Sequence, residues 1–255
     1  MAKRTADWIR QIQSVAILST TAFLIVLPTL DPGQLIKRPL LPPALTGELV
    51  VMSRNAPTTR FIGPDGNYTG FEQDMLELFA KEHNLRLKVI ASGRFSEIIP
   101  SVSNRVAHLA AAGLSVTGER EERVEFGPKY MTVRKTVAYN TDGPRPRKLE
   151  DLVGKRGAVL RGSSSAAALR AEAENIAGLK WKEFNEPDVD KLLDLLSEGD
   201  LDYVVADSNV VELTRNFYPN ISAAFSFGKP EPVAWALPKD ADPQLVHQVN
   251  DFFPL

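Results

Sequence analysis

The sequence predicts an α/β fold with two lobes, the second inserted into the first. Strand-like and helix-like segments alternate from residue 47 onward, as in a parallel sheet covered by helices on both faces. A proline-containing connection at 141–154 interrupts this alternation, and the same order then starts again. A last strand-like and helix-like pair follows residue 232. We therefore expect a first lobe at 47–139 and 228–255 and a second at 140–227.

The first lobe is predicted from the period of its apolar residues. Phe71, Met75 and Phe79 recur every four residues on one face of a helix, and Asn84 can end it in the left-handed conformation. Asp65 and Gly66 mark a hairpin-type turn. The predicted segments are the strands "ELVVMS", "LRLKVIA", "VAHLAAAG" and "RKTVAYN", the helix "FEQDMLELFAKEHN", and the short helix "FSEIIPSVSNR", interrupted at its proline.

The second lobe repeats this order. Gly199 closes an amphipathic helix, and the buried-looking strand "LDYVVADS" ends in polar residues. The predicted segments are the strands "KRGAVL", "KWKEF" and "LDYVVADS" and the helices "SSSAAALRAEAENIA" and "DVDKLLDLLSEG". "VAWALP" and "PQLVHQVNDFF" then supply the final strand and helix of the first lobe.

Composition limits the classes of function. The net charge is −2, and residues 47–255 carry −5, so the clustered positive charge of nucleic-acid binders is absent. There are no cysteines, which excludes disulfides, thiolate metal sites and a cysteine nucleophile. The three histidines lack metal-ligand spacing, and no phosphate loop or nucleophile elbow is present. We expect no catalytic residue, metal or cofactor in this chain.

The first 30 residues have the pattern of an export signal or membrane anchor. Lys3, Arg4 and Arg10 precede the uncharged run "SVAILSTTAFLIVLPTL", which is at the lower limit for a spanning helix. No small-x-small pair closes the run, which favours a retained anchor over a cleaved signal. A proline-rich linker at 31–46 follows. The globular part is therefore expected in the periplasm.

Polar residues follow three predicted strands at their carboxyl ends, where ligands bind in open α/β sheets. Gly113 and Ser115 follow "LAAA", Ser163 follows "GAVL", and Asp207 follows "YVVA". Two lobes would bring these ends to one cleft.

The stretches "YTGFEQDMLELFA", "IIPSVSNRVAHLAAAGLSVTGEREERVEFGPKY", "VLRGSS" and "GDLDYVVADS" resemble the periplasmic solute-binding proteins of family 3, which have the type II two-lobe fold and bind amino acids. The resemblance covers residues 47–253. Within the family, "RPRKLEDLVG", "LDYVVADSNVVEL", "RNFYPNISAAF" and "PEPVAWALP" are most similar to the non-catalytic domain of membrane-bound lytic murein transglycosylase F.

The resemblance implies a role for each candidate site residue. Arg120 and Ser115 match the pair that holds a ligand carboxylate, and Asp207 matches the carboxylate that holds an ammonium. The full set of implied ligand-binding residues is Phe95, Gly113, Ser115, Arg120, Ser163, Ser164 and Asp207.

Each residue also has a purely structural interpretation. Arg120 could pair with a neighbouring glutamate, Ser163 could cap its helix, and Asp207 could cap a strand end. Phe95 could belong to the core, and Gly113 could serve backbone geometry alone.

Two departures from the family qualify the resemblance. The loop "MSRNAPTTRFI" lacks the acidic and aromatic residues of amino-acid binders, and His108 replaces an acidic residue at a position that we expect to be structural. The chain also ends before the family's terminal helix and contains no lysozyme-like domain, so we expect either a truncated chain or a shortened relative.

Three functions stay open. The first is a periplasmic sensor or regulatory domain for amino-acid or muropeptide ligands, partnered by a lytic transglycosylase domain. The second is a stand-alone amino-acid-binding protein serving an ABC permease. The third is a dehydratase on the same fold, with Glu72 or Asp207 as general acid.

Overall fold

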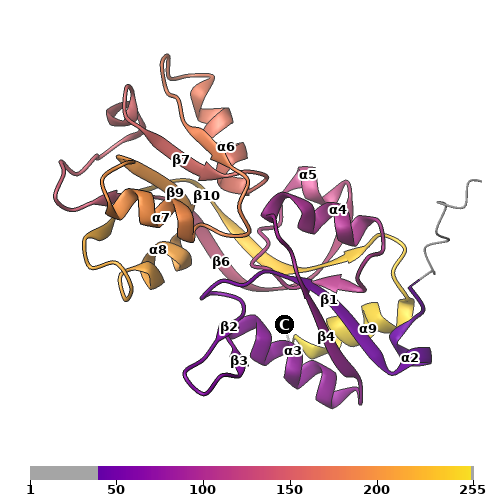
Figure 1. The fold of residues 1–255 in the computed structure, drawn as a ribbon. Coiled ribbons are helices and arrows are strands. Elements are labelled where there is room, and N and C mark those ends of the chain that lie inside the picture. Colours follow the sequence, from indigo (N-terminus) through magenta and orange to yellow (C-terminus); the bar gives the residue numbers. More distant parts are fainter. Residues whose placement is uncertain (1–39, 254–255) are drawn as a thin grey trace, which may run out of the picture. The chain divides into compact units, whose positions relative to one another are not determined.

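The computed structural model describes residues 40–253 and contains a mixed sheet of eight strands in the order β4-β1-β5-β10-β6-β9-β7-β8 (Figure 1). Its strands are β1 (Glu48–Ser53), β4 (Arg86–Ala91), β5 (Leu109–Ala110), β6 (Val124–Asn140), β7 (Gly157–Leu160), β8 (Lys182–Phe184), β9 (Tyr203–Asp207) and β10 (Ile221–Pro238). A separate hairpin consists of β2 (Phe61–Ile62) and β3 (Tyr68–Thr69).

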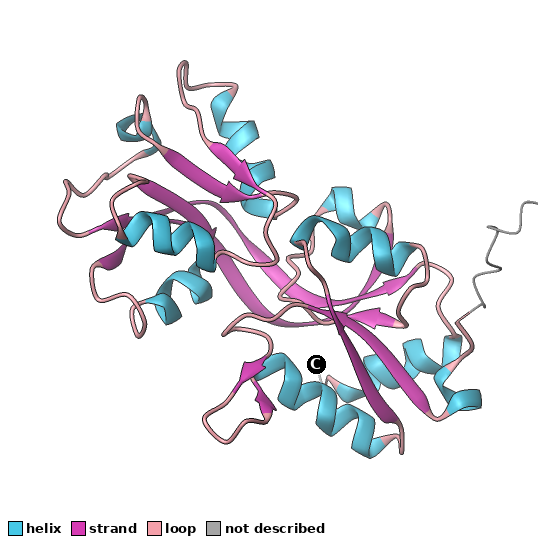
Figure 2. Cartoon of the chain, viewed as in Figure 1, coloured by secondary structure: helices cyan, strands magenta, loops and turns pink. Residues whose placement is uncertain are grey.

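Helices lie on either side of the strands (Figure 2). The helices are α2 (Pro43–Thr46), α3 (Phe71–Glu82), α4 (Ile98–Ser103), α5 (Gly118–Glu121), α6 (Ser164–Ala173), α7 (Asp190–Ser197), α8 (Ser208–Thr214) and α9 (Pro243–Phe252), with 3₁₀ turns η2 (Phe95–Glu97) and η3 (Leu149–Leu152). Among residues 40–253, none of these helices is long and apolar enough to cross a membrane. The predicted signal or anchor, and most of the predicted linker, lie outside the described residues.

Each lobe has its own parallel strands. In the first lobe β1 pairs with β4 and β5, and in the second β7 pairs with β8 and β9. The long strands β6 and β10 pair with each other in antiparallel register and run through both lobes, which makes the sheet mixed rather than purely parallel. The predicted α/β class with an inserted second lobe is therefore confirmed.

The exact lobe boundaries stay a prediction. Lys135–Tyr139 pair with β9, which gives this part of β6 partners in the second lobe. The register between β6 and β10 shifts between Phe227 and Glu231, which is where the predicted boundary at residues 227 and 228 lies.

The alternation of side chains along β1 decides which helices cover it. Leu49 and Val51 pack in a cluster with α3 and α9, whereas Val50 and Met52 point to the opposite face and pack with α4. Figure 1 shows α3 and α9 together on one side of these strands and α4 on the other. The carboxyl ends of the strands are thereby left to the loops that form the site.

Two local predictions need correction. Phe71 was predicted on the apolar face of α3 but is 47% exposed. The buried face instead contains Leu76 and Phe79 together with the charged Glu72, which takes the inward position at the start of the helix. Helix α4 also continues through Pro100, which occupies its first turn, where a missing N–H costs no helical hydrogen bond.

Candidate functional site

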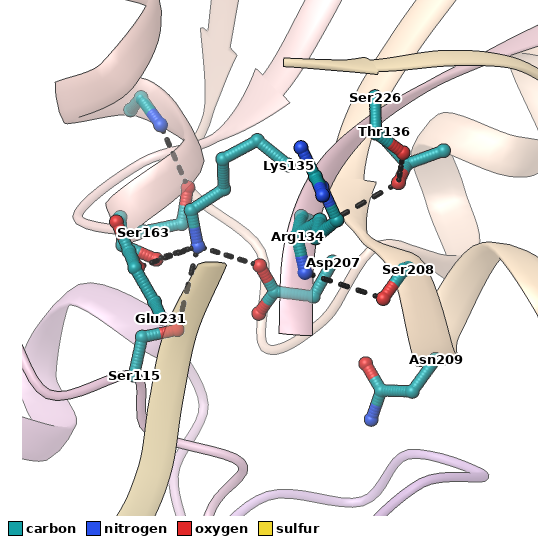
Figure 3. Close-up of polar contacts among 12 residues, drawn as sticks. Ser115, Arg134, Lys135, Thr136, Ser163, Asp207, Ser208, Asn209, Ser226 and Glu231 are labelled. Carbon is teal, nitrogen blue, oxygen red and sulfur yellow. Dashed lines mark hydrogen bonds and ion pairs between the residues drawn. The ribbon is translucent and has the colours of Figure 1, made fainter. Parts of the chain in front are cut away.

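The predicted polar residues meet around a lysine that the sequence analysis did not single out. Lys135 Nζ lies 2.7 Å from Asp207 Oδ1, 2.8 Å from Glu231 Oε2 and 2.5 Å from Ser164 Oγ. It also donates to Ser115 Oγ at 3.4 Å. Figure 3 shows the Lys135 side chain ending between the two carboxylates. The structure thus brings Ser115, Ser164 and Asp207 together through one ammonium group.

The strand register places Lys135 at this point. It lies opposite Asp207 of β9 and follows Val133 by two residues, on the inward face of β6. Its side chain is only 1% exposed, like Val133 and Val137 on either side. A lysine at the middle of such a period-two pattern is the signal by which the sequence could have revealed it.

Arg120 joins the two lobes through backbone carbonyls. Its Nη1 donates to Ser115 O at 2.8 Å and its Nη2 to Gly162 O at 3.1 Å. Burial lowers the pKa of this guanidinium, while the charges of Asp207 and Glu231 act in the opposite direction. No ion pair within residues 40–253 links Arg120 to Glu119 or Glu121, so the interpretation as a solvated pair is wrong.

Ser163 and Gly113 each have a structural function in the fold. Their contacts with a ligand stay predictions. Ser163 Oγ accepts from Ala166 N at 3.1 Å and caps α6. Gly113 has a φ of 64° and donates its N–H to Glu72 Oε2 at 2.8 Å. A side chain at Gly113 would meet strain at this φ and would lie 3.3 Å from Arg54 Nη2.

Phe95 lies between two buried cations. Its ring centroid is 5.1 Å from Cζ of Arg54 and 5.7 Å from Cζ of Arg120, and the residue is 6% exposed. Arg54 comes from the loop after β1 and was not predicted. The rule that polar residues after a strand end face the site applies to Arg54 as well.

Glu72 lies beneath Gly113 and is 1% exposed. Burial raises its pKa to about 7, against the opposing effects of the Tyr130 hydroxyl, of Arg54 and of the Gly113 N–H. Both carboxylate oxygens are engaged, one by Gly113 N and the other by the Tyr130 hydroxyl. These bonds make Glu72 a support for the site's backbone.

Three cavities adjoin this cluster. A space of about 30 Å³ lies between Arg54, Gly113 and Asp207. The second, which we call the Arg120 cavity, measures about 340 Å³ and includes Phe95, Arg120, Ser163 and Ser164. The third, the Arg54 cavity, measures about 220 Å³ and lies between the loop 54–58 and helices α7 and α8.

The surroundings of His108 explain its place in the fold. His108 Nδ1 accepts from Val50 N and its Nε2 contacts Leu41 O, each at 2.9 Å, which gives it the structural function that we expected. Within residues 40–253 no group of three or more histidine or acidic side chains is placed to hold a metal ion.

The chain is similar in sequence and in structure to known proteins. Residues 49–254 match the family profile of the bacterial extracellular solute-binding proteins, family 3. The chain is 36% identical over 208 residues to a membrane-bound lytic murein transglycosylase F from Saccharophagus degradans, and 34% identical over 219 residues to one from Methylobacillus flagellatus. These matches span 82% and 85% of this chain but only 41% and 46% of the relatives.

Among solved structures, the chain is similar to the arginine-bound form of a truncated arginine-binding protein from T. maritima. The TM-score is 0.73 at 25% identity, covering 82% of this chain and 96% of that one.

Proposed function

The chain belongs to the bacterial extracellular solute-binding proteins of family 3, and we propose that it is a periplasmic domain that senses amino-acid-like or cell-wall peptide ligands. The relatives named lytic transglycosylases support a regulatory task, because this chain matches less than half of their length. The activity of such a parent enzyme, and its control by this domain, are part of the proposal.

The observation that carries this proposal is the Arg120 cavity. Arg120 uses two of its five N–H donors on backbone carbonyls, which leaves three for a ligand. The N-terminus of α6 lies at the same cavity, and its free N–H groups attract anions. Arg123, Arg161 and Arg170 also line the cavity. Glu119 and Glu183 line it too, and Glu183 pairs with Arg161 and Arg170, so these charges are partly compensated and the lining keeps a positive excess. A ligand carboxylate fits this surrounding, and cell-wall peptides carry carboxylates.

Asp207 is proposed to hold the opposite end of the ligand. Its Oδ1 is paired with Lys135, whereas no hydrogen bond or ion pair within residues 40–253 uses its Oδ2. A ligand ammonium can therefore bind Oδ2 without displacing Lys135. Ser115, Ser163 and Ser164 would supply neutral hydroxyls between the two charged ends.

Calorimetric titration with purified muropeptide fragments tests this site. Arg120→Ala should weaken binding by roughly 30-fold or more, because losing a buried charged hydrogen-bond partner costs about 2 to 5 kcal/mol. Arg123→Ala removes the same charge from the exposed rim of the cavity and should change affinity by less than about fivefold. Equal affinities for the parent, Arg120→Ala and Asp207→Ala would refute the proposed site.

A stand-alone amino-acid-binding protein of an ABC uptake system is the second candidate. The arginine-bound structural relative favours it. Against it, the first-strand loop presents the cation Arg54 in place of an acidic group, which is unfavourable for a basic amino acid. Titration with free arginine, glutamine and histidine separates the two functions, since tight binding of one of them supports uptake.

The dehydratase alternative has less support. Glu72, one of its two candidate acids, has a pKa of about 7, but both of its oxygens are engaged and the residue is buried. The other candidate, Asp207, is paired with Lys135.

The compartment is also part of the proposal. We expect the uncharged segment 14–30 to direct residues 40–253 into the periplasm, in keeping with the extracellular family and the membrane-bound relatives. A reporter that is active only outside the cytoplasm, fused after Leu255, should be active. Activity confined to a cytoplasmic reporter would contradict this placement.

A further inference from the structure

A further cavity lies at the amino ends of the parallel strands β7 and β9, away from the cleft. It measures about 460 Å³. Tyr203, the first residue of β9, lines it and pairs with Gly157, the first residue of β7. The Arg120 cavity lies past the other end of β7, and the two cavities share no lining residue. We call this second-lobe space the Tyr203 cavity.

The most buried lining residues give the Tyr203 cavity an apolar floor. Leu152 and Tyr203 are each 1% exposed, and Leu201 is 8% exposed. The Tyr203 hydroxyl donates to Lys180 O at 3.0 Å. The Tyr203 ring lies directly against Gly157, where an added Cβ would come within 1.9 Å of Tyr203 Cζ. Only glycine leaves room for the ring at this position, so the floor is fixed by packing.

Two turns that line the cavity are held in place by their own hydrogen bonds. Arg145, in the turn 142–146, donates to Ala224 O through Nε at 3.2 Å and also through Nη2. Asp202, in the turn 199–202, accepts from Arg156 N at 2.7 Å and pairs with the Arg156 guanidinium. The cavity is therefore formed without a ligand, which lowers the entropic cost of binding one.

Charged side chains of both signs line the Tyr203 cavity and balance each other. The lining cations are Arg145 and Lys155, and the lining carboxylates are Asp142, Asp151 and Asp202. Because Arg156 neutralises Asp202, two cations and two carboxylates are left, and the lining has no excess charge. A ligand with a net charge would meet repulsive as well as attractive groups. The lining therefore favours an uncharged ligand.

Both hydrogen-bond donors and acceptors stay free along this lining. Arg145 uses two of its five N–H donors, and the Lys155 ammonium has no hydrogen bond or ion pair within residues 40–253. In the same part of the chain the Asp142 carboxylate has none, and Asp151 uses only Oδ2. A hydroxyl both donates and accepts, so it can bond to a carboxylate and a cation at once. Several hydroxyls on one ligand would satisfy all four groups.

We propose that the Tyr203 cavity binds an uncharged saccharide. Its hydroxyls contact the free charged groups of the lining, while a sugar ring places its C–H face on the apolar floor. The volume of about 460 Å³ falls within the usual range of small-molecule pockets, about 300 to 1,000 Å³. This site goes beyond the proposed function and does not depend on it.

NMR of the full chain with labelled leucine methyl groups tests this site. Cellobiose and N,N′-diacetylchitobiose are suitable probes, because they differ only by an acetamido group in place of one hydroxyl on each ring. At least one of them should shift the methyl signals of Leu152 and Leu201 and saturate them in the millimolar range. Leu213 lines the Arg54 cavity and should not shift. The absence of any shift at Leu152 and Leu201 with both probes would overturn the proposal.

Charged probes separate a saccharide site from other ligand classes. The organic anion 4-methylpentanoate and the zwitterion leucine lack an array of hydroxyls and should bind at least about tenfold more weakly. Saccharide affinity should change less than about twofold between low and high salt, since an uncharged ligand forms no ion pair for salt to screen. Tighter binding of the anion or the zwitterion contradicts a saccharide site.

Variants locate the contacts. Asp142→Ala and Lys155→Ala each remove one free charged partner and should weaken saccharide binding by about three- to tenfold. Lys191→Ala removes a charge from the exposed side of α7, outside the lining, and should leave the affinity within about twofold. All three side chains are exposed, so the variants should fold, and a well-dispersed spectrum establishes this.

Unchanged affinity in both Asp142→Ala and Lys155→Ala refutes the Tyr203 cavity as the site. Muropeptide binding that depends on Arg120 would still stand in that case, because Arg120 lines a different cavity. The two proposals therefore fail separately.

Discussion

Glu72 is a residue whose charge depends on pH near neutrality. Its pKa is raised from 4.5 to about 7, chiefly by burial, so the folded protein binds a proton that the unfolded chain has released. The contribution of Glu72 to the free energy of unfolding is therefore fully present below about pH 4.5 and falls as the pH rises toward 7. Above pH 7 it no longer changes. The loss amounts to about 3 kcal/mol.

Glu72→Gln should remove this dependence. The amide can accept from Gly113 N and donate to the Tyr130 hydroxyl oxygen, so the geometry is kept. The free energy of unfolding of the variant minus that of the parent should rise by about 2 to 3 kcal/mol between pH 5 and pH 8. Urea unfolding at both pH values measures this difference. A constant difference would show that Glu72 ionises normally in the folded state.

At the scale of elements, Lys135 couples β6 to β9 and β10 through charge. Replacing it by methionine leaves Asp207 and Glu231 facing each other without a cation. Removing one partner of a buried ion pair costs about 3 to 5 kcal/mol. We expect Lys135→Met to lose that much unfolding free energy in urea titrations.

Neutralising the partners should restore part of this loss. The triple variant Lys135→Met, Asp207→Asn, Glu231→Gln no longer holds two carboxylates without their ammonium and should be more stable than Lys135→Met alone. If the single variant is as stable as the parent, the ion pairs contribute little to folding.

The elements also show how far sequence patterns reach. Helices α3, α6, α7 and α9 and the parallel strands were predicted, because each carries its own apolar period. The first part of β10 and helix α8 were not. Pro230 and Pro232 suggest a loop, yet the strand continues past them by shifting its register, a solution that depends on its partner β6.

The residues of the candidate site also fall into those that the sequence predicts and those that it does not. Ser115, Arg120 and Asp207 follow strand ends or a family motif, so the sequence predicts them as candidates, and their contacts with a ligand stay a prediction. Lys135 and Glu231 lie where two long strands cross between lobes, and only the pairing of residues about a hundred positions apart brings them together. Arg54 directly follows the end of β1, so the same strand-end rule applies to it.

At the scale of the whole molecule, the lobes contact each other across the cleft. Phe95 N donates to Glu186 O, and Ser96 Oγ donates to Asn185 Oδ1, both at 2.9 Å. Two lobes joined by strand crossings near Phe227–Pro232 should move by a hinge when ligand binds. That movement stays a prediction.

Gly162→Ala tests how closely the lobes must approach. An added Cβ would lie 2.9 Å from Ser96 Cα, so the variant should hold the lobes apart and increase the radius of gyration in X-ray scattering. Gly199→Ala is the matched control, since its φ of 83° causes similar strain but no atom lies within 4 Å of the added Cβ. Identical scattering from both variants would mean that the close approach is not maintained in solution.

The passage of β6 and β10 through both lobes also affects the order of folding during synthesis. Every strand of the first lobe except β10 has been made by residue 140, but the sheet is not joined until residues 221–238 are available to pair with β6. The first lobe therefore cannot join its strands to β6 until nearly all of the chain has been translated, although β6, β9, β7 and β8 can already pair by residue 207. A protein that crosses a membrane before folding benefits from that delay, because an incomplete sheet leaves the chain extended enough to be threaded.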